Sequence, residues 1–481
     1  MLTLADVIEA LTQFRPEMQP LPIAEAAIDS REVVADGMFV AIPGERVDGH
    51  NFVTQAFQAG AVAALVEHPI PEPFTLVDLR GGLPIEGLSH LTPPICLLVE
   101  NTVLALQRIA AFWRSRLDLR VVGVTGSVGK STTKEAIAQV LSQRYKTLKS
   151  LANLNNEIGL PLNVLRLTDE HQYAVLEMGF YVPGEITLLC EIARPQVGVM
   201  NNIGTVHAER AGSQEAIAQG KAELVEALPA SPEGVAILNY DDPFIRPMKA
   251  RTQARVFYYG LDPAADLWAD EVESMGLDGI RFRLHYQKED LHIHVPMIGR
   301  HSVETALRAA AVGVVEGMKW EAIVHGLQEH RAQLRLVVAR TENGALVLDD
   351  TYNASPESTL AALNLLHDLS PGQSNAASGR RIAVLGDMLE LGQYERDGHE
   401  KVGARTAQVA DVLITLGIRA HIIAESASKA GMEKSAIHEY EDMAPIVDWL
   451  KKNLTEDDVV LVKGSHGLHM DQIISTLEVQ R

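Results

Sequence analysis

The stretch "VVGVTGSVGKSTTKEAI", residues Val121–Ile137, joins an apolar run, a glycine-containing turn and a helical pattern. Glycines let backbone N–H groups approach phosphate oxygens, while a helix N-terminus, the ammonium of Lys130 and the hydroxyl of Ser131 add donors and a Mg²⁺ ligand. The spacing is shorter than in the common phosphate loop, because only two residues separate Gly126 from Gly129. The alternative is a glycine turn with a solvated lysine and serine, which the strand–turn–helix context disfavours. The stretch therefore predicts the G-x-x-G-K loop of a subset of phosphate-loop enzymes.

Apolar runs and helical patterns alternate after this loop. Continuous apolar runs at 173–179, 196–202 and 234–239 show no in–out alternation, which is typical of strands buried on both faces. Helical patterns at 184–193 and 213–228 separate them. The pattern predicts a doubly wound parallel sheet with crossover helices.

A second alternating series begins near residue 345, and a helical pair at 301–330 separates the two series. A chain of 481 residues is also too long for one core, given about 150 residues per domain. The Gly/Ser/Asn-rich segment 370–380 is predicted to be a surface loop. We predict an α/β protein of three domains: a small α/β unit in 1–100, a central phosphate-loop parallel sheet in 101–332, and a Rossmann-like unit in 333–481.

Composition and charge restrict the class of function. The chain is 47% apolar and 22% charged, and it has no run of about 20 apolar residues that would span a bilayer. Asp6 and Glu9 interrupt the N-terminal stretch where a signal peptide needs apolar residues, so we expect a cytoplasmic protein. The two cysteines, Cys96 and Cys190, lie in apolar runs and are expected to be buried thiols. The net charge of −21 argues against binding to nucleic acid. We also expect the protein to be a monomer.

Polar residues follow the predicted strands at the edge where ligands collect in open α/β sheets. Glu177 ends one run, Asn201 and Asn202 end the next, and His207 and Lys221 follow. The carboxylate of Glu177 suits Mg²⁺, which prefers oxygen ligands. Taken alone, His207 is more typical of a loop histidine whose hydrogen bonds are satisfied within the protein. Lys221 taken alone is more typical of an exposed helix residue.

Several stretches spread along the chain carry a joint pattern. They are "DSREVVADGMFVAIPGERVDGHNF" (29–52), "TGSVGKST" (125–132), "NLNNEIGLPLNVL" (153–165), "EMG" (177–179), "NNIGTVHAERAGSQEAIAQGKAELVEAL" (201–228), "LDDTYNASPESTLAAL" (348–363), "VLGDMLELG" (384–392) and "LVKGSHG" (461–467). Together, and in this order, these stretches resemble the Mur ligases. The resemblance covers nearly the whole chain and is greatest to the branch that adds D-alanyl-D-alanine to UDP-N-acetylmuramoyl-tripeptide. The first stretch is similar to the uridine-nucleotide module of that branch.

The resemblance implies an ATP-dependent amide ligase with two Mg²⁺ ions and small-molecule substrates. It places Lys130 on the γ-phosphate, Ser131 and Glu177 at one magnesium, His207 at the second, and a carbamylated lysine at Lys221. An ammonium would repel Mg²⁺, whereas a carbamate is an anionic oxygen donor. The residues implied to bind ATP are Thr125, Gly126, Ser127, Val128, Gly129, Lys130, Ser131, Thr132, Arg335 and Asp350.

The resemblance also implies substrate-binding residues in all three domains. The residues implied to bind the dipeptide or the other substrate are Asn155, Asn156, Tyr352 and Asn353. The uridine nucleotide is expected near Ser30, Arg31, Gly49 and His50. By its sequence alone, "DDTYNASPEST" also predicts a strand end and a helix capped near Ser355, with Pro356 at its first position.

The chain departs from the family pattern at Ser302, Thr305, Ser355 and His466, which implies a different fine recognition of the ligands but leaves the phosphate loop unchanged. Two alternatives stay open. One is a related amide ligase, either the enzyme that adds the third residue or a folylpolyglutamate synthase. The other is a non-catalytic ATP-binding protein that kept the fold. The uridine-type N-terminal module disfavours the folate enzyme, and "DDTYNASP" disfavours the third-residue ligase.

Overall fold

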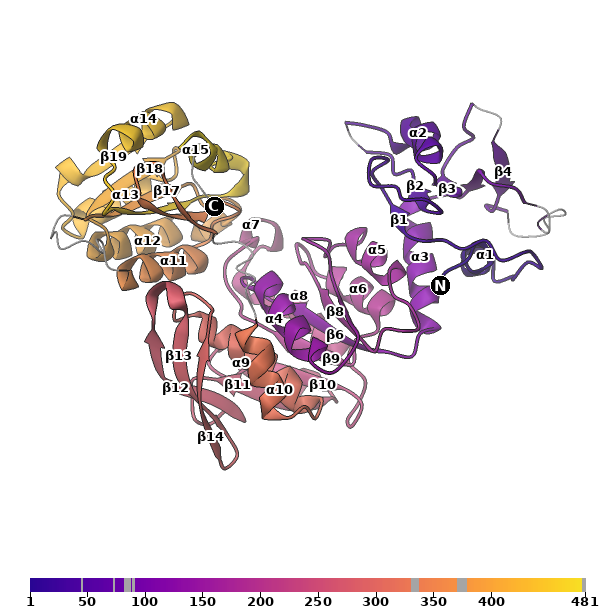
Figure 1. Cartoon of the computed structure of the whole chain (residues 1–481), viewed down its shortest axis with the longest axis horizontal. Coiled ribbons are helices and arrows are strands. Elements are labelled where there is room, and N and C mark those ends of the chain that lie inside the picture. The colour runs from indigo at the N-terminus through magenta and orange to yellow at the C-terminus, as the bar shows by residue number, and fades with distance from the viewer. Residues whose placement is uncertain are drawn as a thin grey trace.

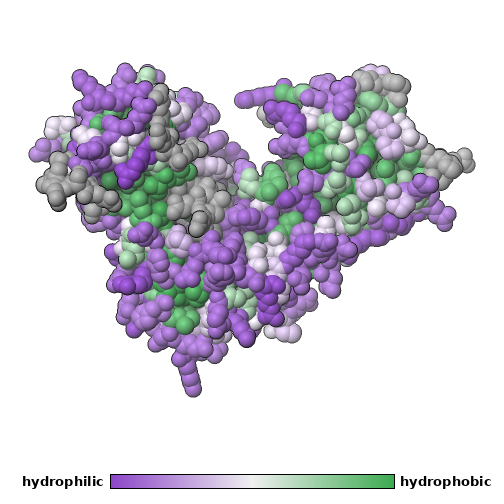
Figure 2. Space-filling model, viewed as in Figure 1, coloured by the Kyte–Doolittle hydropathy of each residue, from purple (hydrophilic) through white to green (hydrophobic). Residues whose placement is uncertain are grey.

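The computed structural model describes residues 1–44, 46–71, 74–81, 88, 91–329, 337–369 and 379–477, which form three sheets. We call the regions around them the N-terminal, central and C-terminal parts. The N-terminal and C-terminal parts stand on opposite sides of the central part (Figure 1). A notch between these two outer parts is open to solvent (Figure 2). The expected α/β class with three domains is confirmed.

The N-terminal sheet has five parallel strands in the order β1-β2-β3-β5-β4. Its middle strands β3 and β5 are fully buried, as their continuous apolar runs require. The elements are α1 (Leu4–Thr12), β1 (Ala26–Ala27), β2 (Met38–Val40), the 3₁₀ helix η1 (Gly49–Phe52), α2 (Val53–Gln58), β3 (Ala63–Val66), β4 (Thr75–Asp78) and β5 (Ile95–Leu98).

The central sheet has the order β14-β13-β12-β11-β10-β9-β6-β8-β7, parallel from β7 to β12 and antiparallel from β12 to β14. Its strands are β6 (Arg120–Thr125), β7 (Thr147–Lys149), β8 (Tyr173–Glu177), β9 (Val197–Met200), β10 (Val235–Asn239), β11 (Arg255–Gly260), β12 (Leu267–Ser274), β13 (Ile280–Tyr286) and β14 (Glu289–Val295). Its helices are α3 (Thr102–Ser115), α4 (Lys130–Ser142), α5 (Gly159–Leu165), α6 (Glu185–Ala193), α7 (Ala208–Ala211), α8 (Gln214–Glu226), η3 (Arg246–Arg251), η4 (Gly276–Asp278), α9 (Ser302–Val315) and α10 (Trp320–Gln328).

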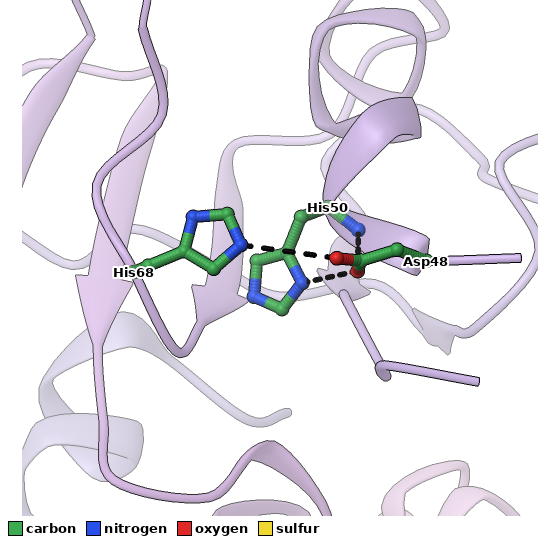
Figure 3. A group of neighbouring side chains, drawn as sticks. All are labelled: Asp48, His50 and His68. Carbon is green, nitrogen blue, oxygen red and sulfur yellow. Dashed lines mark hydrogen bonds and ion pairs between the residues drawn. The ribbon is translucent and has the colours of Figure 1, made fainter. Parts of the chain in front are cut away.

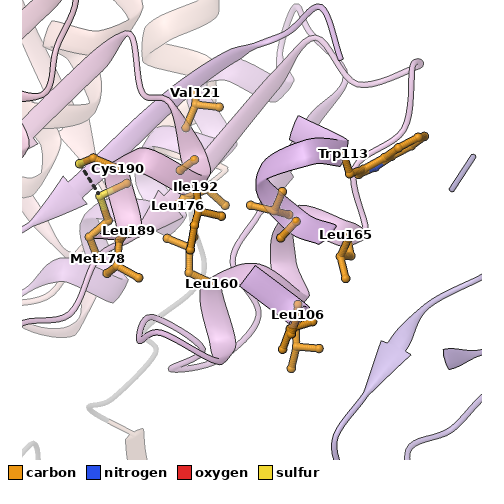
Figure 4. Packing of buried hydrophobic residues seen from close by; sticks show 14 of the residues in the cluster. Leu106, Trp113, Val121, Leu160, Leu165, Leu176, Met178, Leu189, Cys190 and Ile192 are labelled. Carbon is orange, nitrogen blue, oxygen red and sulfur yellow. Dashed lines mark hydrogen bonds between the residues drawn. The ribbon is translucent and has the colours of Figure 1, made fainter. Parts of the chain in front are cut away.

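Two apolar cores cover the two faces of the central sheet, because successive residues of a strand point to opposite sides. Val121 of β6 packs with α3, α5, α6 and α8, whereas Val122 packs with α4, α9 and α10. Figure 4 shows the first core, in which Leu106 and Trp113 of α3 lie near Leu160 and Leu165 of α5. The same core continues into the N-terminal sheet, so α3 joins the two parts.

The C-terminal sheet has the order β15-β16-β20-β17-β18-β19, with β15 antiparallel to the rest. Ser355 caps α11 and Pro356 is its first residue, as predicted. The elements are β15 (Val337–Arg340), β16 (Leu346–Asp350), α11 (Pro356–Asp368), β17 (Arg381–Gly386), η5 (Gly392–Tyr394), α12 (Glu395–Val409), β18 (Val412–Leu416), α13 (His421–Lys429), η6 (Lys434–Ala436), β19 (Ile437–Tyr440), α14 (Met443–Asn453), β20 (Val459–Lys463), η7 (His466–Leu468) and α15 (Asp471–Thr476).

The strands and helices predicted around the phosphate loop and in the C-terminal series are present. The antiparallel extension β12–β14 was not predicted, because its strands are half-exposed and carry many charged residues. Most of the predicted loop 370–380 lies outside the described residues. Cys96 and Cys190 are buried thiols, and burial raises their pKa to about 11 and about 12. None of the helices in the described residues is long and apolar enough to cross a membrane.

Candidate active site

The phosphate loop connects β6 to α4 and depends on both of its glycines. Gly126 has a φ of +154°, and a Cβ atom there would lie 2.5 Å from Cβ of Asn201. Gly129, the N-cap of α4, has a φ of +79°. Only glycine adopts such backbone conformations without strain. Helix α4 begins directly after Gly129. The N–H groups of its first turn have no partner within the helix, so they are available to phosphate oxygens.

Two asparagines that follow β9 hold the phosphate loop by hydrogen bonds. Asn202 accepts N–H bonds from Ser127 at its backbone oxygen (2.9 Å) and from Val128 at Oδ1 (2.8 Å). Asn201 donates from Nδ2 to the carbonyl of Val128 (3.2 Å). The two asparagines thus fix the shape of the turn, while Thr125 is tied to the next strand end through the carbonyl of Met178 (2.9 Å).

Oxygen ligands for a dication gather beside the loop. Ser131 donates from Oγ to Oε2 of Glu177 (2.8 Å), and Asn155 donates from Nδ2 to Oε1 of the same carboxylate (2.7 Å). Glu177 is 1% exposed. A hydroxyl and a carboxylate are oxygen ligands that Mg²⁺ prefers, so Ser131 and Glu177 fit a magnesium ion bound with nucleotide phosphates. The amide of Asn155 holds the carboxylate in position.

Two lysines converge on one carbonyl oxygen of the loop. Nζ of Lys130 donates to the backbone oxygen of Gly126 (2.8 Å), and Nζ of Lys221 donates to the same oxygen (3.1 Å). Lys221 is 2% exposed, so the interpretation as an exposed helix residue is wrong. Burial, and next the charge of Lys130, lower the pKa of Lys221 well below its ordinary value. Burial beside the phosphate loop therefore favours loss of a proton from the amine of Lys221.

His207 lies near the same lysines but is held from the C-terminal part. Its Nδ1 is 2.6 Å from Oε2 of Glu390, and its ring meets the edge of Tyr181 with the centroids 4.7 Å apart. Burial lowers the pKa of His207, and the charges of Lys130 and Lys221 lower it further against the opposing effect of Glu390. The structure thus brings His207 into the electrostatic field of the phosphate loop.

A cavity of about 210 Å³ lies between the phosphate loop and the C-terminal part. Asp350, at the end of β16, pairs with the buried Lys463 (2.6 Å), which also donates to the carbonyl of Asn353 (2.8 Å). Arg335 lies outside the described residues. Sequence-predicted residues that line the cavity are Ser127, Val128, Gly129, Thr132, Asp350, Tyr352 and Asn353, together with the departures Ser302, Thr305 and Ser355.

Two further predicted residues lie at the rim or away from this cavity. The ring of His466 lies 6.0 Å from that of Tyr352, so this departure borders the cavity lining. Asn156 uses Oδ1 to accept the N–H groups of Ile158 and Gly159, which shapes the turn before α5. Its neighbour Asn155, in contrast, reaches Glu177 directly.

The residues predicted to bind the uridine nucleotide all belong to the N-terminal part. Ser30 is buried, whereas Arg31 is exposed and its hydrogen bonds lower the pKa of Asp29 to about 2. Gly49 is required by packing, because a Cβ atom there would lie 2.7 Å from the backbone nitrogen of Ile42. The structure does not bring these residues into the phosphate-loop cavity.

His50 forms a cluster with Asp48 and His68 that has the spacing of a metal site (Figure 3). Its hydrogen bonds argue against that use. Nε2 of His50 accepts the backbone N–H of Glu67 (2.8 Å), so Nδ1 carries the proton and donates it to Asp48 (2.6 Å). His68 stacks on this ring with the centroids 4.1 Å apart. The cluster is therefore a hydrogen-bonded support for the segment that carries Gly49.

A buried arginine that the sequence did not predict supports the helix after the phosphate loop. Arg308 of α9 donates to Thr133 of α4 (3.2 Å), to the hydroxyl of Tyr259 (2.7 Å) and to Glu304 (2.6 Å). These bonds tie α9 and β11 to the first turns of the phosphate-loop helix. The one available signal was a charged residue within the apolar run "TALRAAAV".

Comparison with known proteins agrees with this arrangement of parts. The family described as "Mur ligase family, catalytic domain" matches residues 22–73, the "Mur ligase middle domain" 124–313, and the "Mur ligase, glutamate ligase domain" 331–466. The UDP-N-acetylmuramoyl-tripeptide–D-alanyl-D-alanine ligase of Synechocystis is 35% identical over 461 residues, which cover 95% of this chain and 93% of the relative. The chain belongs to the Mur ligase family.

Solved structures support the same family at the level of the fold. This Mur ligase superimposes on MurF from Acinetobacter baumannii with a TM-score of 0.81 and 30% identity, over 98% of each chain. It also superimposes on the MurF ligase from Thermotoga maritima in complex with ADP, with a TM-score of 0.76 and 27% identity, over 96% of this chain and 98% of the other.

Proposed function

We propose that this Mur ligase joins D-alanyl-D-alanine to UDP-N-acetylmuramoyl-tripeptide at the expense of ATP, giving the UDP-linked pentapeptide precursor of peptidoglycan, ADP and phosphate. The observation that carries the proposal is a phosphate loop whose lysine, serine and neighbouring carboxylate are all in place, in a chain that matches ligases of that name along its full length. A non-catalytic homologue would have no need for the buried Lys221 beside the loop.

The reaction needs ATP because a carboxylate does not acylate an amine at neutral pH. The tripeptide carboxylate oxygen attacks the γ-phosphorus of ATP, the bond to ADP breaks, and an acyl phosphate forms. The amine of D-alanyl-D-alanine then attacks the acyl carbon and loses a proton, and phosphate leaves from a tetrahedral intermediate. Positioning and neutralisation of charge supply most of the rate enhancement in phosphoryl transfer.

The chain's own residues divide these tasks. The loop N–H groups and Lys130 hold the phosphates, and the pair of asparagines keeps the loop in shape. Ser131 and Glu177 would hold the magnesium ion, which supplies charge neutralisation when it is bound, and Asn155 would orient the carboxylate. Asp350 faces the cavity beside the loop, where it would contact the ribose of ATP.

Lys221 would act as a carbamate. Its nitrogen bonds to the carbon of CO₂ and releases one proton, which requires the neutral amine that burial favours. The carbamate would be an anionic oxygen donor that, together with His207, would hold the second magnesium. Alanine at position 221 should abolish activity, and short carboxylic acids in the buffer should restore part of it. A fully active Lys221→Ala variant would refute the carbamate.

The outer parts would bring the other substrates to this centre. The uridine end would bind near Ser30, Arg31, Gly49 and His50, and the dipeptide would bind near Tyr352 and Asn353. The open notch between the outer parts leaves room for the C-terminal part to close over the acyl phosphate and exclude water (Figure 2). Small-angle scattering should show compaction with an ATP analogue and the tripeptide substrate, and an unchanged radius of gyration would count against closure.

Release of phosphate from ATP tests the function. We expect release with UDP-N-acetylmuramoyl-tripeptide that depends on D-alanyl-D-alanine. Release that depends instead on a free diamino acid and the UDP-linked dipeptide would indicate the third-residue ligase. No release with any of these acceptors would indicate a non-catalytic protein.

A further inference from the structure

A carboxylate from the C-terminal part reaches a histidine of the central part. Glu390 follows β17, and its Oε2 lies 2.6 Å from Nδ1 of His207, 183 residues away in the sequence. The side chain of His207 is 19% exposed and that of Glu390 is 36% exposed. A carboxylate only accepts hydrogen bonds, so Nδ1 of the neutral ring carries the proton.

Both residues of this contact have an unusual backbone conformation. His207 has a φ of +67° and Glu390 a φ of +62°, a left-handed conformation that is uncommon for residues other than glycine. The backbone oxygen of Glu390 also accepts the N–H of Glu209 (3.2 Å). Two strained residues that face each other indicate a contact that the surrounding structure enforces.

Neighbouring groups fix the loop that carries Glu390. His399 accepts the N–H of Met388 at Nε2 (3.1 Å), and Ser465 accepts the N–H of Leu389 at Oγ (2.9 Å). Gly392 allows the loop to approach, because a Cβ atom there would lie 3.0 Å from Cα of Glu209. These contacts hold the backbone on both sides of Glu390.

We propose that Glu390 is a positioning residue for His207. It holds the proton on Nδ1 and leaves the lone pair on Nε2 as the ring's ligand atom. Among the described residues, no hydrogen bond involves Nε2 of His207. A second partner that fixes the tautomer and orientation of a metal-binding histidine is a general feature of metal sites. Because Glu390 comes from the C-terminal part, His207 is correctly prepared only when that part is docked.

The metal ion in this inference rests on the proposed function, whereas the contact between Glu390 and His207 does not. The competing explanation is that Glu390 only links the two parts, as Glu357 does through the N–H of Thr205 (3.3 Å). A simple link would leave the tautomer of His207 free. The tautomer is therefore the property that separates the two explanations.

Long-range ¹⁵N–¹H NMR of the full chain labelled with ¹⁵N-histidine measures that tautomer, at a pH where His207 is neutral. The signal is assigned by its loss in His207→Gln. We expect a proton on Nδ1 in the unsubstituted protein and in Glu390→Gln, whose amide oxygen still accepts. Glu390→Ala should shift the proton toward Nε2, and Glu357→Ala should not. Gly392→Val, which keeps the carboxylate but blocks the approach of the loop, should act like Glu390→Ala.

A proton that stays on Nδ1 in both Glu390→Ala and Gly392→Val, or that sits on Nε2 in the unsubstituted protein, would overturn the proposal. In the ligation assay, Glu390→Ala should need about 10–100-fold more Mg²⁺ for half-maximal rate, with Glu390→Gln closer to the unsubstituted protein. An unchanged Mg²⁺ requirement would also overturn it. If the ligase assay fails for the unsubstituted protein while the tautomer result holds, the proposed function is wrong and the positioning contact is not.

Discussion

Substitution of Gly220 by alanine should disturb the support of Lys221 without touching its nitrogen. Gly220 lies in α8, and a Cβ atom there would be 2.0 Å from Cε2 of Phe180. The ring of Phe180 is 3% exposed and packs 4.9 Å from Nζ of Lys221. To lengthen this 2.0 Å separation to an ordinary contact of 3.4 Å, the ring must move by more than ~1 Å within a closed core.

Two opposing contributions set the size of the effect. Overpacking of a core costs about 1–3 kcal/mol. Alanine is favoured over glycine within a helix by about 1 kcal/mol. Because the displacement exceeds 1 Å and the ring is enclosed, we expect the upper end of the first range and a net loss of about 2 kcal/mol. For a unit of 150–250 residues, this corresponds to a fall of about 4–8 °C in the thermal midpoint.

Thermal unfolding followed by circular dichroism measures this fall, and phosphate release measures the accompanying loss of activity. Gly81→Ala is the control, because a Cβ atom there meets no atom of the described residues within 4 Å. If Gly220→Ala melts at or above the temperature of the unsubstituted protein, Phe180 has room to move. That result would refute the idea that the ring of Phe180 is a rigid support for Lys221.

Two other substitutions test the electrostatics of the site. Without CO₂, Lys221 has a lowered pKa, so the unfolded chain binds more protons and the free energy of unfolding should rise with pH up to about 10.5, the ordinary value. Lys221→Met should remove that slope in denaturant titrations and abolish activity, and a retained slope would assign it to another group. Asp350→Asn should weaken the pairing with Lys463 and raise KM for ATP about tenfold with a smaller change in kcat, in steady-state kinetics. An unchanged KM would separate Asp350 from the nucleotide.

The sequence was sufficient where a short segment determines its own structure. The phosphate loop followed from Gly126, Gly129 and the apolar run before them, and the capped helix followed from Ser355 and Pro356. The same local rules found Glu177, because parallel strands end at one edge of the sheet. The resemblance to the family added His207 and Lys221, which local patterns alone assigned to ordinary loop and surface positions.

Other features depend on packing between distant segments and left no local pattern. The contact between His207 and Glu390 spans 183 residues. Arg308 reaches Thr133 from another helix, 175 residues away. The close fit of Gly220 on Phe180 arises only when α8 packs beside the end of β8. Such pairs are set by the tertiary structure, so composition and periodicity cannot identify them.

We expect the chain to activate the tripeptide carboxylate with ATP and to pass the acyl group to D-alanyl-D-alanine. Mass spectrometry of a reaction with UDP-N-acetylmuramoyl-tripeptide labelled with ¹⁸O in its terminal carboxylate tests it directly. We expect the UDP-linked pentapeptide, with one ¹⁸O atom transferred to the released phosphate. Pentapeptide with unlabelled phosphate would contradict the acyl phosphate, and release of phosphate without pentapeptide would contradict the ligase itself.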